Sequence, residues 1–131
     1  MRLAIAVLAV ALCALPATAR TLPQPYIEAY CDGGIDGRYQ HARVDPDGTV
    51  TATNRYDTPE PWPTVATDTA AAKRWFDAIE SASPVEPPDP KNPPVADGIE
   101  CGLLLYERAA PKHYDLPEIH NEIVRHVPGY H

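Results

Sequence analysis

Four segments of this 131-residue chain have the hydrophobic pattern of β-strands. Residues 26–31 alternate, with Ile27, Ala29 and Cys31 on one face and polar or aromatic residues on the other. Residues 38–44 and 49–55 are the second and third segments, and residues 99–107 are the fourth. The fourth is apolar on both faces, which favours a central strand over an edge strand. These segments predict a half-buried antiparallel sheet.

A tight turn separates the second segment from the third. Its sequence is Asp45-Pro46-Asp47-Gly48, in which proline presets the backbone for a turn and glycine allows a positive φ. The two segments are therefore predicted to form a hairpin. Residues 49–55 would then be an open sheet edge, through which the protein could dimerise.

Two other segments have the period of an amphipathic helix. From residue 68 to about residue 82, Ala72, Trp75, Phe76 and Ile79 fall on one helical face, and Thr67 or Asp68 can cap the start. The second helix is predicted over residues 116–127, with an apolar stripe at Leu116, Ile119, Ile123 and Val127. Pro128 and Gly129 end it.

Between the first helix and the fourth strand, residues 83–98 contain six prolines, which predicts an extended connector without regular structure. We therefore expect an α+β fold in a single domain. Its sheet would have four antiparallel strands, with the first amphipathic helix packed on one face and a second helix at the C-terminus.

The N-terminus has the layout of a secretory signal peptide over residues 1–19. Arg2 precedes an apolar run that is too short to span a bilayer, and Ala17-Thr18-Ala19 is a small-residue cleavage site. The mature domain would comprise residues 20–131 and would be exported, either to the periplasm or out of the cell. A lipoprotein anchored through Cys13 is the alternative, although Leu12 is not the small residue that lipid attachment favours.

Removal of this leader would leave Cys31 and Cys101 in an oxidising compartment, where a disulfide between them is expected. Because bridged Cα atoms lie about 4.4–6.8 Å apart, the disulfide would place the first and last strands side by side.

The net charge of −7 argues against nucleic acid as a partner. No second apolar stretch is long enough for a transmembrane helix. We find no cofactor motif, and the sequence predicts no oligomeric state.

The polar face of the predicted sheet is the first candidate binding surface, because tyrosine and arginine give a large contact area with polar groups. Its candidate residues are Tyr26, Tyr30, Tyr39, His41, Arg43 and Tyr106. Alternatively, the C-terminal helix or the loop around Trp62 covers this face and makes it a second small core.

Trp62, between Pro61 and Pro63, is a further candidate. In one interpretation the prolines hold it as an exposed anchor for a partner. In the other, it folds back onto its own domain.

The C-terminal histidines suggest a metal site as an alternative function. His120, Glu122, His126 and His131 could provide imidazole and carboxylate ligands for zinc or copper in a periplasmic metal-binding protein. Glu122 and His126 are equally explained as an exposed pair near a helix C-terminus.

The sequence contains no recognisable nucleophile or acid–base pair, so we do not expect an enzyme. The mature serines, Ser81 and Ser83, lack a Gly-x-Ser-x-Gly context. A hydrolase that uses Asp32, Asp36 and His41 is the least supported interpretation, because a flexible glycine-rich turn explains the two aspartates.

Residues 26–82 and 99–107 together resemble small bacterial proteins of the emfourin kind, which have one sheet and one helix. The shared features are a first strand ending in Gly33-Gly34-Ile35, a hairpin with Asp-x-Asp-Gly-Thr at residues 45–49, an amphipathic helix and a return strand. The resemblance implies an inhibitor of thermolysin-type metalloproteases, and it identifies no inhibitory residue. We therefore expect a non-catalytic binding or inhibitor-like module that acts on a protein or cell-envelope partner.

Overall fold

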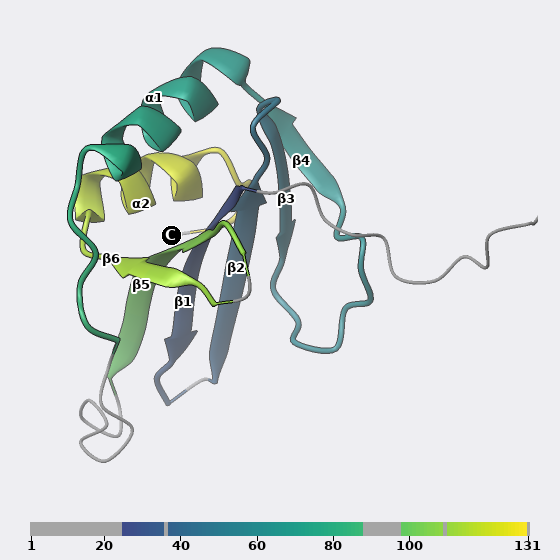
Figure 1. Cartoon of the computed structure of the whole chain (residues 1–131). Helices are drawn as coiled ribbons and strands as arrows, with labels where there is room; N and C mark the ends of the chain where they lie inside the picture. The colour runs from purple at the N-terminus through teal and green to yellow at the C-terminus, as the bar shows by residue number, and fades with distance from the viewer. Residues whose placement is uncertain (1–24, 36, 88–97, 109, 131) are drawn as a thin grey trace, which may run out of the picture.

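The computed structural model describes residues 25–35, 37–87, 98–108 and 110–130. Within these residues the chain forms six strands and two helices (Figure 1). In chain order they are β1 Tyr26–Gly33, β2 Arg38–Val44, β3 Thr49–Thr53, β4 Thr64–Thr67, α1 Thr69–Glu80, β5 Ile99–Tyr106, β6 Lys112–Tyr114 and α2 Pro117–Arg125. The predicted signal peptide and residues 88–97 of the predicted connector lie outside the described residues.

All six strands belong to one antiparallel sheet, in the order β4-β3-β2-β1-β5-β6. The α+β class and both helices are confirmed, but the prediction of four strands was wrong. The two additional strands, β4 and β6, have four and three residues and lie at the sheet edges. Such short strands carry too little alternation to be recognised, because their conformation depends on pairing with a neighbour.

The strand β4 also overturns the predicted open edge, since it pairs with β3 along the side that would have been free. At the opposite edge, the described start of the proline-rich connector is attached to β6. There the Val85 amide donates to the His113 carbonyl at 2.8 Å. The connector was predicted to have no regular structure, and this isolated β-bridge between Val85 and His113 is a small exception.

The predicted disulfide is present and joins two neighbouring interior strands of the sheet. Cys31 of β1 lies directly opposite Cys101 of β5, and their Cα atoms are 4.1 Å apart. The adjacency of the first and last predicted strands is therefore confirmed. The placement of β5 inside the sheet, between β1 and β6, is also confirmed.

The predicted hairpin between β2 and β3 is also confirmed, with Val44 opposite Val50. Gly48 has a φ of 95°, and its carbonyl accepts a hydrogen bond from the Asp68 amide at 2.9 Å. Asp68 is the N-cap of α1, where its carboxylate accepts from the Ala71 amide at 3.0 Å. The hairpin turn thus lies against the start of the helix.

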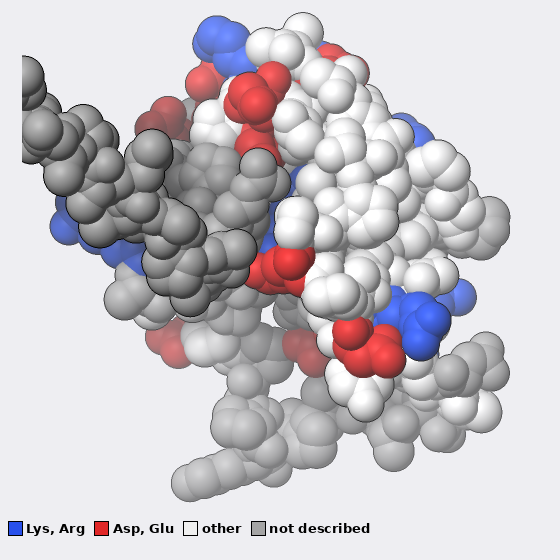
Figure 2. Space-filling model, turned by 90° about the vertical axis from the view of Figure 1, so that its right-hand side faces the viewer, with Lys and Arg blue, Asp and Glu red and all other residues white. Residues whose placement is uncertain are grey.

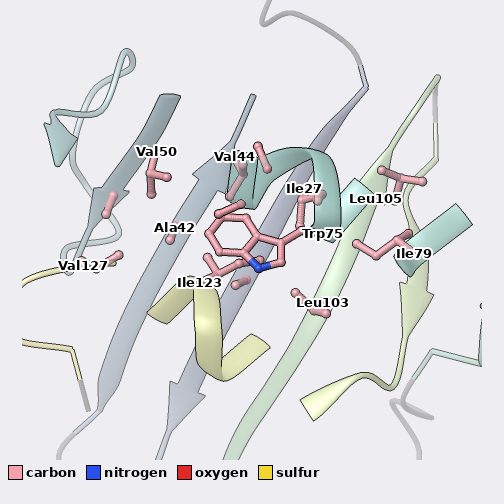
Figure 3. Packing of buried hydrophobic residues seen from close by; sticks show 14 of the residues in the cluster. Ile27, Ala42, Val44, Val50, Trp75, Ile79, Leu103, Leu105, Ile123 and Val127 are labelled. Atoms are coloured by element: carbon pink, nitrogen blue, oxygen red, sulfur yellow. The ribbon is translucent and has the colours of Figure 1, made fainter. Parts of the chain in front are cut away.

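Both helices cover the same face of the sheet, which we call the inner face (Figure 1). Trp75 of α1 is fully buried between Ile123 of α2 and the strand residues Ile27 and Leu103 (Figure 3). The side chains that alternation assigned to the helix side are buried, as predicted. Because α2 lies beside α1, it does not cover the opposite face of the sheet. The prediction that the C-terminal helix covers that face was therefore wrong.

Among the described residues, neither helix has the length and hydropathy needed to cross a membrane. Figure 2 shows the side nearest β3 and β4, where acidic and basic side chains form small separate groups with uncharged surface between them.

Candidate binding face

The opposite face of the sheet, which we call the outer face, carries the candidate binding residues. Alternation along β1 directs Tyr26, Glu28, Tyr30 and Asp32 to this face. On β2, Arg43 lies opposite Glu28, His41 opposite Tyr30, and Tyr39 opposite Asp32. On β5, Tyr106 lies opposite Tyr26, Leu104 opposite Glu28, Gly102 opposite Tyr30, and Glu100 opposite Asp32. The structure therefore brings together the six sheet residues that the sequence assigned to this surface.

His41 is the centre of the outer face and joins two acidic residues of β1. Its Nδ1 lies 2.8 Å from Oε1 of Glu28, and its Nε2 lies 2.8 Å from Oδ1 of Asp32. Burial alone lowers the pKa of His41, but hydrogen bonds with Glu28 and then Asp32 outweigh it, so the net pKa is raised. The two carboxylates therefore favour the charged form of the ring, in which both nitrogens donate.

Two tyrosines flank this imidazole. The Tyr39 ring stacks on His41 with the centroids 4.0 Å apart, and the Tyr30 ring lies at 5.8 Å. Tyr30 also extends across Gly102, where an added Cβ would come within 2.8 Å of the tyrosine hydroxyl. The glycine thus leaves space in which Tyr30 lies flat against β5.

Arg43 is enclosed by the loop between β3 and β4. Trp62 of this loop is only 8% exposed, and its ring centroid lies 3.8 Å from the guanidinium carbon of Arg43. Glu60 from the same loop forms an ion pair with Arg43 at 2.6 Å. Trp62 therefore folds back onto the domain, which was the second of its two predicted placements, and it covers the β2 side of the outer face.

Tyr106 completes the outer face on β5. It stacks on Tyr26 with centroids 4.6 Å apart and an angle of 10° between the ring planes. Burial, followed by the charge of Glu28, raises the pKa of Tyr106 to about 12, and the hydroxyl is hydrogen-bonded to that carboxylate. The buried carboxylate of Glu28 consequently has partners from both β2 and β5.

The part of the outer face beyond the Trp62 loop stays accessible along β1 and β5. We call this half-buried surface the open strip; it consists of Tyr30, Glu100, Gly102, Leu104 and Tyr106. The Asp32 side chain, 40% exposed, borders it. The outer face is thus divided into a covered half and an accessible half.

The residues of the alternative metal site form hydrogen bonds with different groups and not with one common site. His126 lies 3.0 Å from Asp68 through Nε2 and 2.8 Å from the Glu122 carbonyl through Nδ1. These two hydrogen bonds raise its pKa against the effect of burial. The Glu122 carboxylate accepts from Trp75 Nε1 at 2.8 Å, which lowers the pKa of Glu122.

His120, the third of these residues, is buried and lies on the inner face beside the disulfide. Its Nε2 is 3.0 Å from the Tyr30 carbonyl and 3.6 Å from Cys31 Sγ. In the described part of the chain, the one group of three potential metal ligands is Cys31, Cys101 and His120, in which the two sulfurs are bonded to each other. His131 lies outside the described residues.

Three acidic residues of the outer face, Glu28, Glu60 and Glu100, were not among the predicted site residues. Glu28 had a signal in the sequence, because it alternates with Tyr26 and Tyr30 on one strand face. Glu60 had none, since its contact with Arg43 depends on the path of a loop. Asp32, considered only for hydrolysis, is instead a hydrogen-bond partner of His41, and Asp36 lies outside the described residues.

Comparisons of this chain with protein-family models, with curated proteins and with solved structures give no match. The emfourin-like resemblance therefore stays a prediction from the sequence. The function has to be argued from the arrangement of the residues themselves.

Proposed function

We propose that this protein is an exported, non-catalytic recognition module that binds a protein partner through the open strip of its outer face. The observation that carries the proposal is the pre-organised arrangement of Tyr30 and Tyr106, which are half-buried and held by neighbouring rings, with the half-buried Leu104 on the same strip. Aromatic side chains in fixed positions contribute contact area at a low cost in conformational entropy.

The buried polar groups beneath the strip support binding better than catalysis. Both nitrogens of His41 are engaged by carboxylates, so neither is available to accept a proton from a substrate. Glu28 is only 6% exposed and is engaged by His41 and Tyr106. These groups fix the strand register and the tyrosine rings rather than face a reactant.

The charge around the strip indicates the chemistry of the partner. Asp32 and Glu100 lie side by side at one end, and the overall charge of the protein is −7. A complementary partner surface would carry lysine or arginine beside apolar or aromatic side chains. This acidic end would mainly increase the association rate and make binding sensitive to salt.

Inhibition of a thermolysin-type metalloprotease is the more specific form of this proposal and rests on the emfourin-like resemblance. The stabilising disulfide and the burial of Trp62 against the sheet suit a small exported inhibitor, which has to resist proteolysis. Inhibition would require that this protein, when its open strip contacts the protease, also blocks the substrate cleft of the protease.

The test begins with immobilised, oxidised protein exposed to native periplasmic and secreted fractions, with and without a chelator. A protein that binds saturably is then purified and titrated against variants at low and physiological salt. We expect Tyr30→Ala to raise the dissociation constant by about ten-fold or more, as for a central aromatic contact. Tyr56→Ala is the matched control, because Tyr56 is 84% exposed and lies off the strip.

Leu104→Gln should weaken the same interaction, and Glu100→Gln should lower the association rate and its salt dependence. If Tyr30→Ala and Leu104→Gln bind as tightly as the unchanged protein, the strip is not the binding surface. A thermolysin-type metalloprotease is assayed in parallel, and unchanged peptidase activity at saturating protein would exclude inhibition of that enzyme without affecting the recognition proposal.

A further inference from the structure

The two cysteines of the disulfide differ in their exposure. Cys31 is 6% exposed and lies beneath α2, whereas Cys101 is exposed. Both cysteines line an open cleft of about 580 Å³, which is within the range of small-molecule pockets. Cys101 is therefore the more accessible of the two cysteines to a small molecule in the cleft.

His120 is positioned beside the less accessible sulfur. Its Nε2 lies 3.0 Å from the Tyr30 carbonyl, which can only accept, so Nε2 carries the ring proton. The same nitrogen is 3.6 Å from Cys31 Sγ. A thiolate formed at Cys31 would compete with the Tyr30 carbonyl for this single N–H, and hydrogen bonds to charged acceptors are stronger than those to neutral ones.

The cleft has an acidic lining. Among the described residues that form it, Glu86, Glu100 and Asp115 carry carboxylates and Arg38 carries a guanidinium. An anionic thiol would meet a net negative charge, whereas a neutral or cationic thiol would not.

From this arrangement we propose that Cys101 is a thiol–disulfide exchange site for small neutral or cationic thiols, with Cys31 as the leaving thiolate. The thiolate of the small molecule attacks Cys101 Sγ and forms a new S–S bond with it. The Cys31–Cys101 bond breaks, and its electron pair goes to Cys31 Sγ, where Nε2–H of His120 stabilises the charge. The number of disulfide bonds is unchanged, and attack by Cys31 on the mixed disulfide reverses the step.

The first experiment uses the unchanged oxidised protein with cysteamine as the probe. The reaction is quenched with acid at low conversion, free thiols are alkylated with N-ethylmaleimide, and peptide mass spectrometry locates both groups. We expect cysteamine on Cys101 and the maleimide on Cys31, with a preference of about ten-fold or more. Equal labelling of the two cysteines, or cysteamine mainly on Cys31, would overturn the proposal.

A second experiment tests the role of His120 as a positioning residue. His120→Leu should slow the exchange about five- to ten-fold, because the leaving thiolate loses its donor. His113→Leu is the matched control within the same cleft and should change the rate less than two-fold. Equal rates in the two variants would remove His120 from the mechanism.

The preference for the class of thiol is measured with 3-mercaptopropionate, which adds a negative charge where cysteamine adds a positive one. We expect cysteamine thiolate to react faster at low salt, and the ratio of the two rates to decrease as salt is added. A faster reaction of the anionic thiol would contradict the proposed class. The cleft shares Glu100 with the open strip. None of these measurements uses a protein partner, however, so their failure is distinguishable from the failure of the proposed function.

Discussion

The two faces of the sheet are covered in different ways. On the inner face, α1 and α2 bury Trp75 and Ile123 in an apolar layer. On the outer face, the Trp62 loop covers Arg43, and the remaining contacts are ion pairs, hydrogen bonds and stacked rings. Apolar packing tolerates many arrangements, whereas paired charges fix a few side chains in one arrangement.

This difference indicates that the two faces contribute to different properties of the protein. The inner face supplies most of the apolar area removed from water, and this area dominates folding stability. The outer face buries the carboxylate of Glu28, which is tolerated only because His41 and Tyr106 are its partners. Stability should therefore depend mainly on the inner face, and recognition on the outer face.

The two tryptophans provide the most direct test of this comparison. Trp75→Ala should lower the free energy of unfolding by about 4 kcal/mol, because it opens a cavity in a fully buried layer. Trp62→Ala should cost about 2 kcal/mol, because that ring, although only 8% exposed, packs on Arg43 and not within the apolar layer. Both values are measured by urea denaturation, and the comparison fails if Trp62→Ala costs as much as Trp75→Ala.

The next largest effect is expected where the β2–β3 hairpin meets α1. A Cβ at Gly48 would lie 2.5 Å from the Thr69 amide nitrogen, and the φ of Gly48 is 95°. Gly48→Ala should therefore destabilise the protein by about 3 kcal/mol, since neither backbone can move without separating the hairpin from the helix.

Gly37→Ala is the matched control, with a φ of 62° and open space around the added methyl group. It should show only the conformational cost of about 1 kcal/mol. Equal losses in the two variants would mean that the contact between the turn and the helix contributes nothing.

The inner face could largely be predicted from the sequence, because its signals are local and periodic. The spacing of Ala72, Trp75 and Ile79 predicted α1, and the alternation of Ile27, Ala29 and Cys31 predicted the buried side of β1. The strands β4 and β6 were missed because their few residues become extended only by pairing with β3 and β5.

The outer face could be predicted only as a set of residues, not as an arrangement. Alternation placed Tyr30, His41 and Arg43 on it, but alternation carries no information on which loop returns to cover them. The contacts of Glu60 and Trp62 with Arg43 depend on the path of the chain between β3 and β4. For the same reason, the sequence left open whether Trp62 is exposed or folded back.

The charge network of the outer face should make stability depend on pH. Because the pKa of His41 is raised in the folded protein, the folded state binds this proton more tightly than the unfolded chain does. The stabilisation is complete below the usual histidine pKa of about 6.5, and it is lost as the pH rises through the higher folded-state value. We expect a loss of about 1 kcal/mol, measured by urea denaturation between weakly acidic and weakly alkaline pH.

His126 acts in the same direction, since its pKa is also raised, but its side chain is more exposed than that of His41. His41→Gln should therefore remove most of the pH dependence, and His126→Gln a smaller part. If His126→Gln flattens the profile and His41→Gln leaves it unchanged, the outer-face network does not contribute as the geometry indicates.

Two tyrosines, one on each side of the sheet, give the smallest but most specific contrast. Burial is the main cause that raises the pKa of both Tyr106 and Tyr130 to about 12, but Glu28 contributes only at Tyr106. Tyr130 packs against the inner core and donates to the carbonyls of His41 and Thr53. Near-UV absorbance should thus show two tyrosines that ionise only near pH 12, identified by their loss in Tyr106→Phe and Tyr130→Phe.

Glu28→Gln removes the nearby negative charge, so it should lower the pKa of Tyr106 and leave that of Tyr130 unchanged. A shift of both tyrosines would mean that the variant loosens the whole sheet, and the outer network would then not be separable from the inner core.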